Sequence, residues 1–260
     1  MVESKRLLDK VAIVTGAANG IGLAICEAFA REGAKVVMAD LDEGKCMSEA
    51  RRINKDGTSI SAMACDVSRE NDINHLLQST LSRWGMIGVL VNNAAVALDG
   101  NIIQMPEADW DRVMNTNLKS AFWTIKATLP HMIEAKKGSI INISSTQAFR
   151  SWDNWTAYAA AKGAMMSMTR QLAGQFGSSN VRFNTISPGA ILTPLNEKRA
   201  QTEGPDFLLK SANMHALERL GTPYEVAMTA VFLASDESGF ITGTDIRVDG
   251  GLSTLPRYLR

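Results

Sequence analysis

Residues 11–22 read Val-Ala-Ile-Val-Thr-Gly-Ala-Ala-Asn-Gly-Ile-Gly, and this stretch decides the fold. Residues 11–15 form a short apolar run with β-branched side chains, which is typical of a strand buried on both faces. From Ile21 to Arg31 the apolar residues recur at helical spacing. Glycines allow a tight turn, and the free amides at a helix N-terminus attract a pyrophosphate. The stretch therefore predicts a dinucleotide site, although its glycine spacing differs from the general GxGxxG fingerprint.

Strand-like and helix-like segments alternate along the rest of the chain. Strands are predicted near 11–15, 35–39, 59–65, 87–92, 138–144, 181–187 and 244–248, and helices near 20–32, 42–55, 69–84, 107–135, 156–177 and 223–235. This order predicts an α/β fold: a single Rossmann-type, doubly wound domain over 1–260, with about seven parallel strands and helices on both faces. Ligands are then expected at the carboxyl ends of the strands.

Charge and hydropathy exclude several classes of partner. Twenty-seven basic and twenty-seven acidic residues balance, so no electrostatic feature favours binding to nucleic acid or to an anionic membrane. The segment Met1 to Lys10 is polar and charged, and no apolar stretch reaches membrane-spanning length. We expect a soluble, cytoplasmic protein that acts on a small molecule.

The cysteines and histidines do not have metal-ligand spacing. They are Cys26, Cys46, Cys65, His75, His131 and His215. The cysteines are odd in number and lie in predicted helices and a strand, so we interpret them as reduced packing residues. The scattered histidines are interpreted as surface or helix-end residues, and no metal is predicted.

Asp40 ends the second predicted strand, about eighteen residues beyond Gly22. A carboxylate there can accept hydrogen bonds from both adenosine ribose hydroxyls and would repel a 2′-phosphate, which favours NAD over NADP. Neither Leu41 nor Asp42 is basic. The alternative is that Asp40 forms a strand-end turn before a helix N-cap at Asp42.

Tyr158 and Lys162 are separated by one turn of a predicted helix, and Ser145 lies thirteen positions before the tyrosine. At this spacing the ammonium would favour the phenolate and lower the tyrosine pKa from its usual value of ~10. A serine hydroxyl beside the tyrosine could hold the oxygen of a carbonyl or an alcohol. The alternative is that the pair only marks a solvated helix face.

Several motifs together make the chain resemble the short-chain dehydrogenases/reductases over nearly its whole length. Thr15 to Gly22 matches the cofactor motif TGxxxGxG, and Tyr158 and Lys162 match YxxxK. Further matching segments are Asn92-Asn93-Ala94-Ala95, with Ala95 in place of a glycine, Asn117, Asn142-Ile143-Ser144-Ser145, Ser187-Pro188-Gly189 through Thr193, and Asp249-Gly250-Gly251. The resemblance implies an oxidoreductase that uses a nicotinamide cofactor.

The resemblance also implies roles for individual residues. The catalytic set would be Asn117, Ser145, Tyr158 and Lys162, with Asn117 interrupting its helix and holding a water that links Lys162 to solvent. The NAD-binding set would be Gly16, Asn19, Gly20, Ile21, Gly22, Asp40, Leu41, Asp66, Val67, Asn93, Ala94, Tyr158, Lys162, Pro188, Gly189, Ile191 and Thr193. Asp66 would reach the adenine side, and it could also cap the helix predicted near Ser68. Lys162 would also bind the nicotinamide ribose.

The segment from Thr146 to Trp155 combines aromatic rings with amide and carboxylate groups. Such a mixture suits a sugar or polyol, with Ser145, Gln147, Trp152, Trp155 and Tyr158 as substrate-binding candidates. The tryptophans could instead pack a loop or a subunit contact. Gln147-Ala148-Phe149 replaces a glycine that is common in the family. The polar stretch from Leu195 to Arg219 is expected to belong to a mobile lid over about 192–219.

Other functions and the assembly state remain open at this point. A 3-oxoacyl-thioester reductase would share the framework, but such reductases in the family usually use NADPH. A nucleotide-sensing regulator or scaffold that has lost catalysis is an alternative of another class. Apolar and small residues on more than one face of the helices near 107–135 and 156–177, together with the resemblance, predict a homotetramer.

Overall fold

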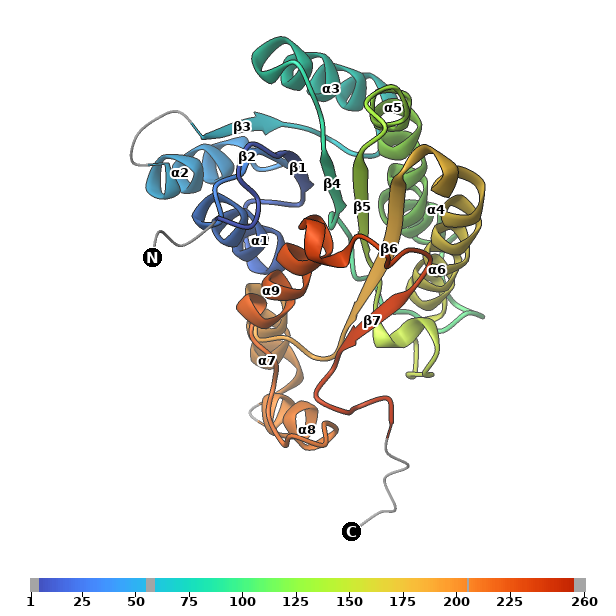
Figure 1. Ribbon diagram of the computed structural model, residues 1–260. Coiled ribbons are helices and arrows are strands. Elements are labelled where there is room, and N and C mark those ends of the chain that lie inside the picture. The colour runs from blue at the N-terminus through green and yellow to red at the C-terminus, as the bar shows by residue number, and fades with distance from the viewer. Residues whose placement is uncertain (1–4, 55–58, 205, 255–260) are drawn as a thin grey trace.

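The computed structural model describes residues 5–54, 59–204 and 206–254. Its centre is a parallel seven-stranded sheet with the order β3-β2-β1-β4-β5-β6-β7 (Figure 1). The strands are β1 (Val11–Thr15), β2 (Lys35–Asp40), β3 (Ile60–Ala64), β4 (Val89–Asn92), β5 (Gly138–Ile143), β6 (Val181–Pro188) and β7 (Asp245–Val248). The order reverses beside β1, which creates the crevice where ligands bind in open α/β sheets. The predicted fold class is confirmed.

Helices cover both faces of the sheet. They are α1 (Gly20–Arg31), α2 (Glu43–Ile53), α3 (Glu70–Trp84), α4 (Glu107–Met114), α5 (Ser120–Glu134), α6 (Thr156–Phe176), α7 (Pro194–Glu203), α8 (Phe207–Asn213) and α9 (Pro223–Ala234). One core contains residues of α1, α2 and α9, and the other contains residues of α3, α5 and α6.

The strand β1 shows how the apolar sequence builds both cores. Its side chains alternate, so that Ala12 and Val14 enter the first core and Ile13 enters the second. Because both faces are covered, the strand is a continuous apolar run rather than an alternating one.

Two predicted regions are subdivided in the structure. The helix predicted over 107–135 contains a π-helical turn at Asn115–Lys119, which separates α4 from α5 and coincides with the interruption that the resemblance implied at Asn117. The region 192–219 contains α7 and α8, which the sequence pattern did not predict. None of the side chains of α7 is buried, so the helix lacks an apolar stripe and is defined instead by its N-terminal Thr193-Pro194 cap.

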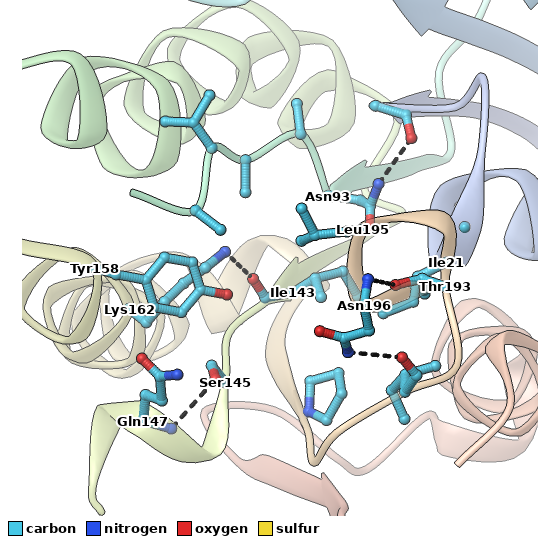
Figure 2. A pocket seen from close by; sticks show the side chains of 18 of the residues that line it. Ile21, Asn93, Ile143, Ser145, Gln147, Tyr158, Lys162, Thr193, Leu195 and Asn196 are labelled. Atoms are coloured by element: carbon cyan, nitrogen blue, oxygen red, sulfur yellow. Dashed lines mark hydrogen bonds between the residues drawn. The ribbon is translucent and has the colours of Figure 1, made fainter. Parts of the chain in front are cut away.

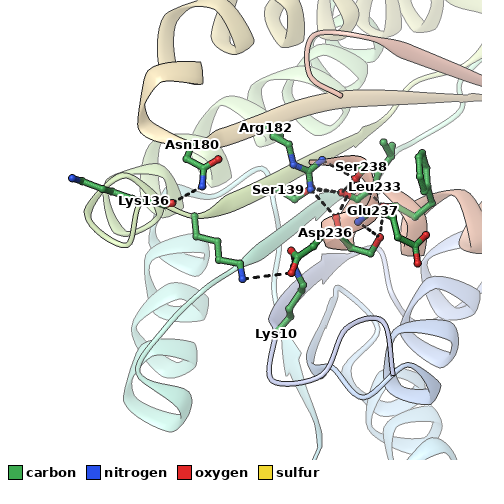
Figure 3. A network of polar contacts seen from close by, with 12 residues as sticks. Lys10, Lys136, Ser139, Asn180, Arg182, Leu233, Asp236, Glu237 and Ser238 are labelled. Carbon is green, nitrogen blue, oxygen red and sulfur yellow. Dashed lines mark hydrogen bonds and ion pairs between the residues drawn. The ribbon is translucent and has the colours of Figure 1, made fainter. Parts of the chain in front are cut away.

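Arg182 on β6 ties the sheet to the C-terminal end of α9 (Figure 3). Its guanidinium donates to the carbonyl oxygens of Leu233 and Ser235 at 2.8 and 3.2 Å, and to the Ser238 hydroxyl at 2.9 Å. The last carbonyls of a helix have no partner within the helix, so this contact stabilises the end of α9.

The cysteines and one histidine can now be placed. Cys26, Cys46 and Cys65 are buried and unpaired, which confirms their interpretation as packing residues. Burial raises the pKa of the Cys46 thiol to about 12, so this thiol is unreactive. His215 directly follows Met214, the C-cap residue of α8, so its interpretation as a helix-end residue holds, but it is 1% exposed and is not a surface residue. Among the described residues, no helix is long and apolar enough to cross a membrane.

Candidate active site

A cavity of about 920 Å³ lies at the carboxyl ends of the strands. The predicted cofactor residues that line it are Gly16, Asn19, Gly20, Ile21, Asp40, Leu41, Asp66, Val67, Asn93, Ala94, Tyr158, Lys162, Pro188, Gly189, Ile191 and Thr193. The predicted substrate residues Ser145, Gln147, Trp152 and Trp155 also line it. Gly22 and Asn117 stand outside the wall. The structure thus collects nearly all the candidate residues in one place.

The glycine turn between β1 and α1 packs tightly enough to exclude side chains. A Cβ atom on Gly22 would lie 2.1 Å from the Gly16 carbonyl oxygen, and one on Gly16 would lie 2.8 Å from the Cα atom of Ala94. Gly16 has a φ of 65°, which is strained for other residues. Asn93 holds the turn by donating from Nδ2 to the carbonyl oxygens of Thr15 and Gly16 at 3.0 and 2.9 Å.

Asp40 is fixed at the edge of the glycine turn. One carboxylate oxygen accepts from the Ala18 amide at 2.8 Å, and the other accepts from the Asp42 amide at 3.0 Å. Asp42 accepts from the Lys45 amide and caps α2. Asp40 therefore does form the strand-end turn, and it also lines the cavity beside Leu41. Each oxygen keeps a further lone pair for a ribose hydroxyl.

Asp66 and Val67 line the cavity as well, and the capping role considered for Asp66 is only partly right. Its carboxylate accepts from the amide and the hydroxyl of Ser68 at 3.0 and 2.6 Å. The helix itself begins at Glu70 with Arg69 at the N-cap position, so Asp66 shapes the preceding turn rather than the helix end.

Ser145, Tyr158 and Lys162 meet in the cavity (Figure 2). Tyr158 and Lys162 lie on α6, and Ser145 follows β5. The Ser145 hydroxyl accepts from the Gln147 amide at 3.2 Å, which fixes its oxygen. The Lys162 ammonium donates to the carbonyl oxygen of Ile143 at 2.6 Å. Lys162 is 1% exposed, so the alternative of a solvated helix face is wrong.

The electrostatics of this group differ from the prediction. Burial raises the pKa of Tyr158 to about 12, although a hydrogen bond with Ser145 acts in the opposite direction. Burial also lowers the pKa of Lys162 to about 8. The prediction that Lys162 lowers the tyrosine pKa is therefore wrong for the cofactor-free protein, because loss of solvation dominates and only the hydrogen bond with Ser145 opposes it.

Asn117 lies in the π-helical turn, so the predicted interruption of its helix is present. Its amide is fully buried and pairs with the main chain of Val96, accepting from the nitrogen and donating to the oxygen at 2.8 Å each. Val96 lines the cavity. The side chain therefore holds the cavity wall, and its part in a proton relay remains a prediction.

His215 holds the segment that follows β6 through a hydrogen bond and a packing contact. The Nε2 atom accepts from the Ala190 amide at 3.0 Å, so Nδ1 carries the proton and donates to the Ser211 carbonyl oxygen at 2.8 Å. Gly189 packs against this ring, since a Cβ atom there would lie 2.6 Å from Nε2. Thr193 caps α7 by accepting from the Asn196 amide.

The substrate side of the cavity presents an unpaired donor and an unpaired acceptor. Within the described part of the chain, Trp152 Nε1 and Gln147 Oε1 are buried atoms without a hydrogen-bond partner. Trp155 is 8% exposed and meets the Tyr158 ring edge-on, with the ring centres 5.5 Å apart. Buried polar atoms are normally paired, so the unpaired Trp152 Nε1 and Gln147 Oε1 atoms are suited to substrate hydroxyls.

Sequence reasoning missed the cavity residues of α7 and α8. Asn196, Arg199, Phe207 and Lys210 line the cavity. A signal was present, because Thr193-Pro194 is a helix start and Leu195, Arg199 and Glu203 then follow at four-residue spacing.

The residues present fit a nicotinamide dinucleotide. The glycine turn admits no Cβ atom at Gly16 or Gly22, so its backbone stays bare at the edge of the cavity, and the Asp40 carboxylate, Tyr158 and Lys162 line the same cavity. Over residues 5–54, 59–204 and 206–254, no group of three or more His, Cys, Asp or Glu side chains could hold a metal ion.

Comparisons with known proteins agree with this arrangement. The family model described as enoyl-(acyl carrier protein) reductase matches residues 16–253. A 3-oxoacyl-[acyl-carrier-protein] reductase of Thermotoga maritima is 37% identical, with 95% of this chain and 99% of that protein covered. A 2-(S)-hydroxypropyl-CoM dehydrogenase of Xanthobacter autotrophicus is 35% identical, with 97% and 100% covered.

A solved structure is also similar. It is a chain from Agrobacterium tumefaciens assigned as a gluconate dehydrogenase, with a TM-score of 0.91, 31% identity, and 97% of this chain and 99% of that chain covered. The family match spans most of the sequence, and each of these relatives is covered almost completely. The chain belongs to the short-chain dehydrogenase/reductase family, whose members are oxidoreductases that bind a nicotinamide cofactor.

Proposed function

We propose that this protein is an NAD-dependent oxidoreductase that interconverts a secondary alcohol and a ketone, with a sugar or polyol as the substrate. The observation that carries the proposal is that Ser145, Tyr158 and Lys162 share one cavity with Asp40 and the glycine turn. A proton-transfer group and a cofactor-binding edge thus face the same space.

The preference for NAD rests on Asp40. Its carboxylate is held by the Ala18 and Asp42 amides and lines the cavity. It can accept hydrogen bonds from ribose hydroxyls, whereas a 2′-phosphate would meet a fixed negative charge.

In the proposed reaction, NAD accepts a hydride from the alcohol, and NADH returns it in the reverse direction. The Ser145 hydroxyl holds the substrate oxygen. The Tyr158 hydroxyl takes the proton from the alcohol as a phenolate, and gives it back in the reduction. Lys162 favours the phenolate with its charge and would bind the nicotinamide ribose. Because burial alone disfavours the phenolate, catalysis needs the positive charges of Lys162 and of the oxidised nicotinamide ring.

The choice of a sugar or polyol rests on the unpaired Gln147 Oε1 and Trp152 Nε1 atoms. An acceptor and a donor beside the catalytic group suit a substrate with several hydroxyls. The similarity to a gluconate dehydrogenase supports the same substrate class.

A second candidate is a 3-oxoacyl-thioester reductase. The similarity to the Thermotoga maritima reductase supports it, and so does the description of the family model. Such an enzyme would be expected to prefer NADPH, which Asp40 disfavours.

The test is a two-cofactor screen of the purified protein. NAD and NADP reduction is measured over sugars, sugar acids, polyols, simple alcohols and hydroxy acids, and NADH and NADPH oxidation is measured with an acetoacetyl thioester. Turnover of a polyhydroxylated compound with NAD supports the proposal. Thioester reduction with a strong NADPH preference would replace it with the second candidate. Binding of NAD without turnover of any compound would indicate a regulator.

We also propose a homotetramer. Phe122 on α5 is 47% exposed, and it lies beside Trp123 with ring centres 4.8 Å apart. Exposed adjacent aromatic rings are favoured in subunit contacts. Light scattering at micromolar concentration should give about four times the chain mass of 28.2 kDa, and a monomer would contradict the proposal.

A further inference from the structure

We infer that the substrate carries a carboxylate and that Arg199 on α7 binds it. This inference rests on the proposed function and narrows it to a hydroxy acid, with a sugar acid as the first choice. The residue lies on the wall of the cavity and belongs to the segment that sequence reasoning did not resolve into helices.

The Arg199 guanidinium lies over two aromatic rings. Its Cζ atom lies 4.9 Å from the ring centre of Trp155 and 4.9 Å from that of Phe207. These two cation–π contacts restrain the group. Its side chain is 29% exposed, so it is substantially removed from water. A restrained guanidinium binds a carboxylate through the edges that carry its N–H donors.

One edge is already used. Nε donates to Glu203 Oε1 at 2.7 Å, and Nη2 contacts the same oxygen. Within the described part of the chain, no hydrogen bond is made by Nη1. The remaining edge is therefore a pair of donors, Nη1 and Nη2, in a fixed plane, which matches the geometry of a carboxylate. Glu203 orients the group and leaves this second edge for the ligand.

The position of Arg199 relative to the catalytic group sets the kind of molecule. Trp155 contacts both residues. Its ring meets the Tyr158 ring edge-on, and the Arg199 guanidinium lies over the same tryptophan ring. A substrate that reacts at Tyr158 and also reaches Arg199 must have several atoms between its carbinol carbon and its carboxylate. A sugar acid has this length, and its intervening hydroxyls could pair with Gln147 and Trp152.

The charge of the surrounding wall favours the same ligand. Lys210 on α8 lines the cavity as a second cation from this region. The carboxylates Asp153 and Glu203 also line it, and Glu203 is already paired with Arg199. A neutral polyol can accept hydrogen bonds from these two cations but has no charge to pair with them.

The test compares matched substrates in matched variants. Each hydroxy acid is paired with a neutral alcohol of the same carbon number, namely gluconate with sorbitol and 6-hydroxyheptanoate with 2-heptanol. The variant Arg199→Gln removes the charge from the cavity wall. The control Lys198→Gln removes the same charge from an exposed neighbour on α7 that does not line the cavity.

We expect the parent protein to prefer the acid in a pair. In Arg199→Gln, kcat/KM for the acid should fall about tenfold to a hundredfold, mainly through KM, because a charged hydrogen-bonded pair is lost. Turnover of the neutral partner should stay within about twofold, and Lys198→Gln should change neither. NAD binding, followed by tryptophan fluorescence, and the melting temperature should be unchanged in both variants.

Two different failures can be told apart. Equal loss for the acid and the neutral alcohol in Arg199→Gln, or a parent that prefers neutral alcohols, would overturn the inference and leave the dehydrogenase proposal standing. Absence of turnover for every compound in the screen would overturn the proposed function, and the inference with it.

Discussion

The ammonium of Lys162 lies 5.6 Å from the ring centre of Tyr158 and donates its hydrogen bond to the Ile143 carbonyl instead. The two residues are neighbours on α6, yet burial disfavours the charged form of each. It raises the pKa of the tyrosine to about 12 and lowers the pKa of the lysine to about 8. In the cofactor-free site both groups are therefore mostly neutral between about pH 8 and about pH 12. Under the proposed mechanism, the bound cofactor would supply the charge that makes the tyrosine a base.

The first prediction concerns Tyr158→Phe, which removes only the hydroxyl. Turnover should fall by about 10²- to 10⁴-fold, because this is the proposed acid and base. In the parent protein, alcohol oxidation should become faster as the pH rises, because the phenolate is the reactive form. The measurement is a pH profile of NAD reduction, with the melting temperature and NAD binding as checks on folding. A variant that keeps turnover within a few-fold of the parent would rule out the role.

The second prediction concerns stability and the buried Lys162. Its pKa is about 8 in the folded protein and 10.5 ordinarily, so between these values the unfolded chain holds more protons. The free energy of unfolding of the parent should then rise with pH through this window, relative to Lys162→Met. Urea unfolding of both proteins near pH 7 and near pH 9.5 measures this difference. A difference independent of pH would mean that the ammonium is not desolvated.

The third prediction concerns cofactor choice. Asp40→Asn removes the negative charge beside the ribose but keeps an acceptor for the Ala18 amide. The ratio of kcat/KM for NAD to that for NADP should fall by at least about tenfold, which corresponds to about 1.4 kcal/mol. Asp42→Asn is the matched control, since this carboxylate caps α2 and does not line the cavity. An equal change in both variants would count against Asp40 as the selector.

Much of the cofactor half of this site could be predicted from the sequence, and much of the substrate half could not. The glycine turn and Asp40 follow a strand within a few residues, so local patterns reveal them. Arg199 reaches Trp155 only because α7 folds across the cavity, and no local pattern records that contact. The pKa of Tyr158 likewise depends on burial by distant segments. The burial of His215 was not predicted because a lone histidine gives no sign of its tertiary surroundings.

The fourth prediction uses two glycines with opposite surroundings. Gly22→Ala places a Cβ atom 2.1 Å from the Gly16 carbonyl oxygen, so the turn must move, and NAD binding and stability should both be lost. Gly174→Ala on α6 meets no atom within 4 Å and should raise the free energy of unfolding by about 0.5–1 kcal/mol. Calorimetry and fluorescence titration with NAD test the pair. Normal NAD binding by Gly22→Ala would show that the turn is not the cofactor cradle.

The fifth prediction concerns Arg182, which binds the last carbonyls of α9 (Figure 3). Arg182→Met removes these charge-assisted hydrogen bonds, although Ser139 and Ser238 still donate to the same carbonyl oxygens, and should lower the free energy of unfolding by roughly 1.5–3 kcal/mol. Arg170→Met on the exposed side of α6 is the control and should change it by less than about 0.5 kcal/mol. Denaturant unfolding measures both. A loss no larger than in the control would show that water replaces the guanidinium at the helix end.

The cavity wall comes from two sources that are separate along the chain. The strand ends and α6 supply the glycine turn, Asp40 and the proposed proton-transfer group, whereas α7 and α8 supply Arg199, Phe207 and Lys210. Under the proposed function, the reaction would then depend on residues anchored to the sheet, and selection of the substrate would depend on a surface segment of about twenty residues. Replacing α7 and α8, by evolution or by design, would then change which substrate is accepted without changing the residues that bind the cofactor and transfer the proton.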